Sequence, residues 1–282
     1  MLESMFNPKR LEKGPWKMFF IGFLYASLSL ILVKWFFSQD TVLSQFSGMI
    51  VVTFCVMFTI PFMYFIIREE EAEDEESFGF LSVWRIHKDA IYSFFWLFFG
   101  FIVAFSFWYL VLHDSTLFNA QIQTYCAINS PGSISSCVSK YDFSGTGAAT
   151  QSLRFVSIIE NNIYVMIFTL IFSLIFGAGA IFVLAWNASV ISAAISIFSG
   201  QNIASIPLGI LRYMIHGFPE VVAYFITALA GGIFGVGIIR NGMQNKKFLH
   251  VIENTIILLF ISLLILVLAA VIEVYITPIL FG

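Results

Sequence analysis

Apolar stretches long enough to cross a lipid bilayer recur along this chain and constrain its fold more than any other feature. A helix needs about 20 apolar residues to span the hydrocarbon core. Apolar residues make up 59% of the 282-residue chain and charged residues only 11%, which is typical of a membrane protein rather than a soluble domain. The pattern predicts an all-α, polytopic transmembrane helical bundle of about seven spans, at residues 17–37, 47–67, 91–112, 157–176, 180–199, 218–239 and 252–272.

Composition divides the chain into three regions. Residues 1–90 hold two spans and an acidic cytoplasmic loop whose charged run covers 68–76, residues 91–156 hold the third span and a long exterior loop, and residues 157–282 form the remaining membrane domain. Blocks of like charge are usually solvated linkers, and the alternative reading of the run is a docking patch for a basic partner. The net charge of -3 leaves no basic face for a phosphate backbone, which excludes nucleic acid and leaves membrane lipid as the surroundings.

Basic residues beside the spans predict the orientation. Cytoplasmic loops carry the excess of Lys and Arg, and three groups of basic residues fall on one side of the predicted membrane. The N-terminus is therefore expected in the cytoplasm of a multi-pass cell-membrane protein, and an odd number of spans places the C-terminus outside. The first span is interpreted as a retained anchor. The basic residues are Lys9, Arg10, Lys13, Lys17, Arg68, Arg85, Lys88, Arg240, Lys246 and Lys247.

Two cysteines lie in the loop that this orientation places outside. Cys126 and Cys137 are embedded in a segment rich in Ser, Gly, Thr and Asn, and an oxidising compartment permits a disulfide there. Two free thiols in the loop are the alternative. Cys55 lies within the second span and is interpreted as a small packing residue.

Glycines separate the fourth and fifth spans. Gly177 and Gly179 supply a permissive turn within an otherwise continuous apolar run. Two spans, or one long bent helix over 157–199, are both compatible with this pattern.

The C-terminal half carries polar side chains at membrane depth. Such groups are costly in lipid and require a partner or a role. For Asn187, in the fifth span, a hydrogen bond to another helix or a contact to a substrate would satisfy the amide. We expect the carboxylates and His216 to converge near the outer membrane face, with Arg212 as the counter-charge. The predicted polar cluster comprises Glu160, Asn161, Asn162, Asn187, Arg212, His216, Glu220 and Glu273.

The segment 200–217 is too apolar for an ordinary loop and too short to span. Ser205 can cap a helix and Gly217 can end it, which predicts a short re-entrant or interfacial helix. Pro219 then fits the first turn of the sixth span, with Glu220 near the positive end of that helix.

The sixth span is suited to close helix packing. Gly231 and Gly235 follow the small-residue spacing that lets a neighbouring helix backbone approach. We expect this face to pack against the fifth span, and the alternative is an interface between two copies of the chain.

A series of residues in the C-terminal half stands in a characteristic order: Asn161-Asn162, Gly177 and Gly179, Asn187, His216-Gly217 with Glu220, the glycine-rich sixth span, and Ala269-Ala270-Val271-Ile272-Glu273 with Pro278. Over about residues 155–282 this series resembles the stage II sporulation protein M family. The chain departs from the family at Asn187-Ala188, where the family tends to have Asn-Gly.

The resemblance implies a polytopic membrane protein, and it implies no catalytic residues. In spore-forming bacteria the family's namesake is similar to a membrane platform that holds cell-wall hydrolases during engulfment, while many relatives occur in organisms that never make spores. The first hypothesis is therefore a membrane scaffold for protein partners, with homo-oligomers compatible with the pattern. The second is a transporter or channel lined by the polar residues.

An intramembrane enzyme using His216 and the carboxylates is the least favoured hypothesis. The sequence holds no HExxH-like pair of metal ligands on one helix and no nucleophile-base motif. No metal, no cofactor and no enzymatic activity are therefore predicted.

Overall fold

The computed structural model of the chain describes residues 14–74, 80–129, 151–176, 180–200, 202–241 and 246–281. Over these ranges the regular elements are all helical, which confirms the predicted fold class. The spanning helices are α2 (Lys17–Phe36), α3 (Ser47–Asp74), α4 (Phe80–Leu112), α7 (Gln151–Phe176), α8 (Ala180–Phe198), α9 (Ile206–Asn241) and α10 (Lys246–Val271). The shorter ones are η2 (Leu43–Phe46), η3 (Ser115–Phe118), α5 (Asn119–Asn129), η4 (Ile203–Ser205), η5 (Ile272–Ile276) and α11 (Thr277–Phe281).

The described part of the chain contains 7 helices long and apolar enough to cross a membrane. Their apolar windows agree with the predicted spans except at the sixth and seventh, which are much longer. The windows are Lys17–Phe36, Leu43–Pro61, Ile91–Leu112, Phe155–Leu174, Ile181–Phe198, Ile203–Gly235 and Val251–Phe281. The protein is thus a multi-pass membrane protein.

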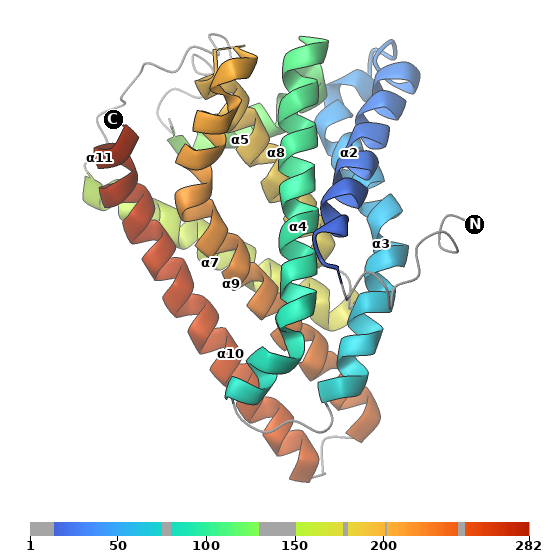
Figure 1. Cartoon of the computed structure of the whole chain (residues 1–282), viewed down its shortest axis with the longest axis vertical. Coiled ribbons are helices and arrows are strands. Elements are labelled where there is room, and N and C mark those ends of the chain that lie inside the picture. Colours follow the sequence, from blue (N-terminus) through green and yellow to red (C-terminus); the bar gives the residue numbers. More distant parts are fainter. Residues whose placement is uncertain are drawn as a thin grey trace.

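Consecutive spanning helices run in opposite directions (Figure 1). Helix α4 packs on α2 and α8, and α9 packs on α10, α7 and α8. Helix α8 therefore joins an α2–α3–α4 side of the bundle to an α7–α9–α10 side. We call the end of the bundle that holds α5 and α11 the α5 end.

The α2–α3–α4 side has a continuous apolar core. Phe98, Phe101 and Phe105 of α4 are fully buried in it, together with Phe118 of η3. Glycines bring the backbones of α2 and α4 together, because a Cβ at Gly22 would overlap the Leu97 carbonyl oxygen. The α2–α4 contact therefore depends on the absence of a side chain there.

The break expected at Gly217 is wrong. Helix α9 continues from Ile206 to Asn241 with Pro219 inside it, so no separate re-entrant helix forms and Glu220 does not begin a new one. Gly200, with φ of 55°, is the glycine that follows a helix end. Gly217 instead lies at the α8 contact, where an added Cβ would be 3.5 Å from Ile191 Cδ1.

The loops on either side of α4 are more helical than their composition predicts. Helix α3 continues through the acidic run as far as Asp74, so this part is not a loop. The predicted exterior loop contains η3 and α5. Cys126 of α5 is buried and disulfide-bonded, while its expected partner Cys137 lies outside the described residues.

The fourth and fifth spans are two separate helices, α7 and α8, and Gly177 and Gly179 between them lie outside the described residues. The partner of the sixth-span glycines differs from the expected one. An added Cβ would lie 2.8 Å from the Leu170 carbonyl oxygen at Gly231, and 2.8 Å from the Leu174 carbonyl oxygen at Gly235. The glycine face of α9 therefore packs within the chain on α7, the fourth span, rather than on the fifth.

Candidate functional site

Polar side chains recur every four residues along the first half of α9. Arg212, His216, Glu220 and Tyr224 are spaced by four within one unbroken helix, which aligns them along one face. Each side chain has a polar contact. Glu220 and Tyr224 bond with each other, and Arg212 and His216 contact the C-terminal helical turns. The continuity of α9 therefore creates an intramembrane polar stripe that a break at Gly217 would have divided.

The Glu220 carboxyl group is held by its own helix. The Tyr224 hydroxyl donates a hydrogen bond to Glu220 Oε1 over 2.7 Å. Glu273, which belongs to the π-helical turn η5, lies close enough for its charge to act on Glu220, Tyr224 and Tyr213. Helix α9 and η5 are in contact, so two of the predicted acidic residues lie on adjacent elements although they are far apart in the sequence.

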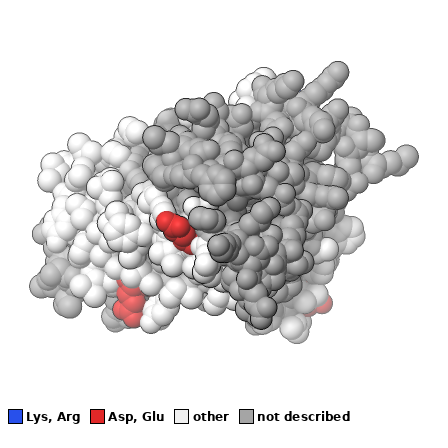
Figure 2. Space-filling view, turned by 90° about the horizontal axis from the view of Figure 1, so that it is seen from below, with Lys and Arg blue, Asp and Glu red and all other residues white. Residues whose placement is uncertain are grey.

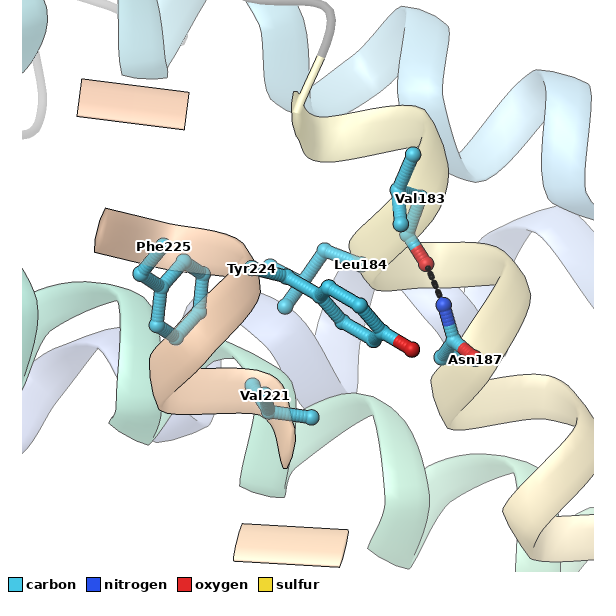
Figure 3. A pocket seen from close by; sticks show the side chains of 6 residues that line it. All are labelled: Val183, Leu184, Asn187, Val221, Tyr224 and Phe225. Carbon is cyan, nitrogen blue, oxygen red and sulfur yellow. Dashed lines mark hydrogen bonds between the residues drawn. The ribbon is translucent and has the colours of Figure 1, made fainter. Parts of the chain in front are cut away.

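A small cavity of about 10 Å³ lies between α8 and α9 and is lined in part by Tyr224. Figure 3 shows the Tyr224 hydroxyl directed toward Asn187 across it. The other lining residues are apolar: Val183, Leu184, Val221 and Phe225. A space of this size holds about one water molecule.

Asn187 satisfies its amide within α8. Its Nδ2 donates to the Val183 carbonyl oxygen over 2.8 Å, one turn back along the same helix. This bond, and not one to another helix, is the contact that the structure gives to the amide nitrogen. Asn187 is nevertheless one of the residues that line the cavity.

The C-terminal turns pack on the start of α9 through polar contacts. Arg212 Nη1 donates to the Phe281 carbonyl oxygen over 3.0 Å, and its guanidinium lies 4.8 Å from the centre of the Phe198 ring. The Thr277 hydroxyl lies 3.4 Å from His216 Nδ1. Arg212 is therefore bound to a carbonyl group and an aromatic ring in place of the predicted carboxylate partner.

A π-helical turn places Glu273 and Thr277. In η5 the Thr277 hydroxyl donates to the Ile272 carbonyl oxygen, five residues back, over 3.1 Å. Such turns inside α-helices frequently occur at functional sites. This turn brings the end of the seventh span against α9 and α7, as the ring pair Phe155–Tyr275 also shows.

The predicted polar residues of α7 divide between two faces. Glu160 is exposed and accepts a hydrogen bond from the Tyr164 hydroxyl over 3.3 Å. Asn162 is buried, with 4% of its surface exposed, and its Oδ1 accepts from Asn161 Nδ2 over 3.3 Å. Glu160 therefore lies on the outward face of α7, whereas Asn162 faces the bundle.

Charged side chains are sparse on the described surface. Figure 2 shows the end of the molecule opposite α5, where the described acidic side chains form separate patches among uncharged ones. The described residues contain no group of three His, Cys, Asp or Glu side chains that could hold a metal ion.

Several residues of the site were missing from the sequence prediction. Tyr224, Tyr213 and Thr277 are each hydrogen-bonded to a group from the polar stripe or from α5. The spacing of four from Glu220 to Tyr224 is a local signal that could have identified Tyr224. Tyr213 and Thr277 depend on tertiary contacts to Tyr125 and His216, which no local pattern encodes.

Comparison with known proteins gives one finding. A family model of stage II sporulation protein M matches residues 93–278, more than half of the chain, whereas no curated protein and no solved structure matches it. The match begins within α4, well before residue 155, and it includes α5, the polar stripe and η5. The chain belongs to the stage II sporulation protein M family.

Proposed function

We propose that this protein is a non-enzymatic scaffold of the cell membrane, which holds partner proteins at its extracytoplasmic surface. In this proposal the N-terminus is cytoplasmic and the C-terminus and α5 are outside, as the basic residues beside the spans predict. The membrane platform implied by the family resemblance is of the same kind. A scaffold requires a surface held in one conformation, because a preordered surface loses less entropy on binding.

The observation that carries the proposal is the attachment of α5 to the spanning helices. Gln121 Nε2 donates to the Gly48 carbonyl oxygen of α3 over 2.9 Å. The Tyr125 hydroxyl lies 3.3 Å from the Tyr213 hydroxyl of α9. Ile122 and Cys126 are buried in the main apolar core. Helix α5 therefore presents its exposed side, including Gln123, on a base fixed to both sides of the bundle.

A transporter or channel is the second candidate, and the polar stripe of α9 favours it. Acidic and amide side chains inside spanning helices often mark ion or substrate paths. The cavity beside Tyr224 measures about 10 Å³, which is room for about one water molecule.

The experiment is an affinity purification from native membranes with identification of the recovered proteins. A scaffold should recover a defined extracytoplasmic partner, and Gln123→Arg should reduce that recovery because it adds a charge to the exposed side of α5. Glu253→Gln is the matched control. It changes the net charge by the same +1, at an exposed position in the first turns of α10, at the end of the bundle opposite α5.

Reconstitution of the pure protein into liposomes distinguishes the two candidates. Ion or solute flux through the protein alone would favour the transporter. Equal recovery of the partner with wild type and Gln123→Arg, at unchanged protein stability, would contradict docking on α5.

A further inference from the structure

Four helices meet at one apolar layer inside the α7–α9–α10 side. Val183 of α8, Ala223 and Tyr224 of α9 and Leu266 of α10 are packed together, with Val165 and Met166 of α7 against them. Consecutive spanning helices run in opposite directions, so a step toward the α5 end is four residues back along α7 and α9 and four residues forward along α8 and α10. That step reaches Asn162 on α7, Asn187 on α8, Glu220 on α9 and Ala270 on α10.

Asn162 is an unpartnered donor at this level. Its Nδ2 is buried and has no hydrogen-bond partner. Ile158 and Met166, one turn to either side on α7, pack on residues of α10 and α9, so Asn162 faces the same interior. An unsatisfied amide at membrane depth costs several kcal/mol, which indicates that something else bonds with it.

Glu220 supplies the charge of the site. It lies one turn from Ala223 and Tyr224, which face α7 and α10 in the apolar layer, and it therefore faces the same interior as Asn162. Its Oε1 accepts from Tyr224, and the charge of Glu273 acts on it. Neighbouring carboxylates in a medium of low polarity are costly unless a positive charge or a proton accompanies them.

Among the described residues, the charged and titratable side chains near Glu220 come from α9 and η5. His216 and Tyr224 lie one turn away on α9, and Glu273 faces it from η5. Helices α7 and α8 contribute the neutral amides Asn162 and Asn187 at this level. Arg212, two turns away, is bonded to the Phe281 carbonyl oxygen.

We propose that Glu220, Asn162, Asn187 and Tyr224 form a binding site for one small monovalent cation, either a proton or Na⁺. The cavity of about 10 Å³ that Asn187 and Tyr224 line accommodates one water-sized species. The groups are carboxyl, amide and phenol oxygens, which suit hard cations. For a proton, neutral Glu220 keeps the hydrogen bond that it accepts from Tyr224. For Na⁺, a half-turn of both the Asn161 and Asn162 amides keeps their mutual hydrogen bond and presents Asn162 Oδ1 as a ligand.

The site is independent of the proposed scaffold role, and its test needs no partner protein. The purified chain in detergent micelles is treated with a hydrophobic carbodiimide, which reacts with protonated carboxyl groups, and modification of Glu220 is followed by peptide mass spectrometry. Labelling should fall as the pH rises. If the cation is Na⁺, a concentration ten times the dissociation constant should slow labelling by about tenfold relative to choline; if it is a proton, Na⁺ should have no effect.

Melting temperatures provide the second measurement and cover the case in which the reagent cannot enter. The wild-type melting temperature should depend on pH or on Na⁺ in a way that Glu220→Gln abolishes and Glu160→Gln, on the outward face of α7, preserves. Asn162→Leu should lower the melting temperature and weaken that dependence.

Two results would overturn the site. One is a rise of the melting temperature in Asn162→Leu, because a truly unpartnered amide is relieved by an apolar side chain. The other is an identical response of wild type and Glu220→Gln to both pH and Na⁺.

Discussion

The helices around α4 and the helices around α9 pack by different means. Around α4, one apolar core extends through α2, α3, α4 and α8, with fully buried phenylalanines at its centre. Between α7, α9 and α10, three small apolar clusters alternate with polar pairs such as Thr227–Ser262 and Glu220–Tyr224. Lipid is as apolar as Leu, so shape complementarity is the main support of the first region, which also has interhelical hydrogen bonds such as that from Trp108 to Ser27. The second region adds ionisable groups to its hydrogen bonds. Within the membrane, the first should be insensitive to pH and ions, and the second should respond to them.

The largest expected effect tests the shape-based packing of α2 on α4. Gly22→Ala places a methyl group on the Leu97 carbonyl oxygen and should lower the free energy of unfolding by about 3 kcal/mol, because the two backbones must separate. Denaturant unfolding in detergent micelles measures the change.

The control for that substitution is Gly232→Ala in α9. An added Cβ at Gly232 has no atom within 4 Å, and this variant should unfold like the wild type. Similar losses in Gly22→Ala and Gly232→Ala would mean that helix glycines are sensitive everywhere, and the contrast between the two regions would fail.

A smaller effect tests the hydrogen-bonded packing of α9 on α10. The Ser262 hydroxyl donates to the Ala223 carbonyl oxygen over 2.8 Å and lies 2.6 Å from the Thr227 hydroxyl. Ser262→Ala removes both contacts and should cost about 1 kcal/mol in the free energy of unfolding.

Ser196→Ala is the matched control on the α4 side of the bundle. The Ser196 hydroxyl bonds only the Ser192 carbonyl oxygen of its own helix over 2.8 Å, a contact that contributes little to stability. A loss in Ser196→Ala as large as that in Ser262→Ala would show that burial of a hydroxyl, and not its bond to another helix, decides the effect.

The sequence predicted the spans well because hydrophobicity is a local property. The third span, expected at 91–112, is Ile91–Leu112 in the structure. The expected break at Gly217 and Pro219 failed for a physical reason. The rules that Gly ends a helix and Pro begins one describe helices in water. Within a membrane no water competes for the freed backbone groups, and a helix tolerates both residues.

The candidate site was predicted in part because its members are polar residues in apolar runs. Their partners were not predictable, since the Arg212 contact to Phe281 and the Tyr213 contact to Tyr125 depend on how distant segments pack. The Asn187 bond to Val183 is local instead. A carbonyl group one turn back on the same helix is always within reach, so the amide bonds there and not to another helix.

A further prediction concerns the attachment of α11 to α9. Arg212→Gln removes the cation that lies over the Phe198 ring. The shorter Gln side chain also weakens the hydrogen bond to the Phe281 carbonyl oxygen. The loss of global stability should be about 0.5 kcal/mol, but amide hydrogen exchange in residues 277–281 should accelerate. Unchanged exchange there would show that apolar contacts alone hold the C-terminal turn.

The smallest expected effect lies on the α4 side, where a polar cap is placed in a turn outside the membrane. Asp40 Oδ1 accepts from the backbone N–H groups of Leu43 and Val42, each over 2.8 Å, and these bonds lower the pKa of the Asp40 carboxyl below its ordinary 3.8. Since the pKa is lower in the folded than in the unfolded state, this stabilisation is present above about pH 4 and lost as the pH falls through the folded-state value.

Asp40→Asn should therefore be slightly less stable than wild type at neutral pH, and the difference should shrink as the pH falls well below 3.8. Melting curves of the two proteins across this pH range measure the difference. Asp114 caps η3 by accepting from the Thr116 N–H group, and Asp114→Asn is the companion variant. A difference that is independent of pH would mean that the amide loses the cap for steric reasons. The melting temperature of the wild type can also change with pH by much more than it differs from that of Asp40→Asn. In that case the contrast between the two regions assigns the additional change to groups on the α9 side.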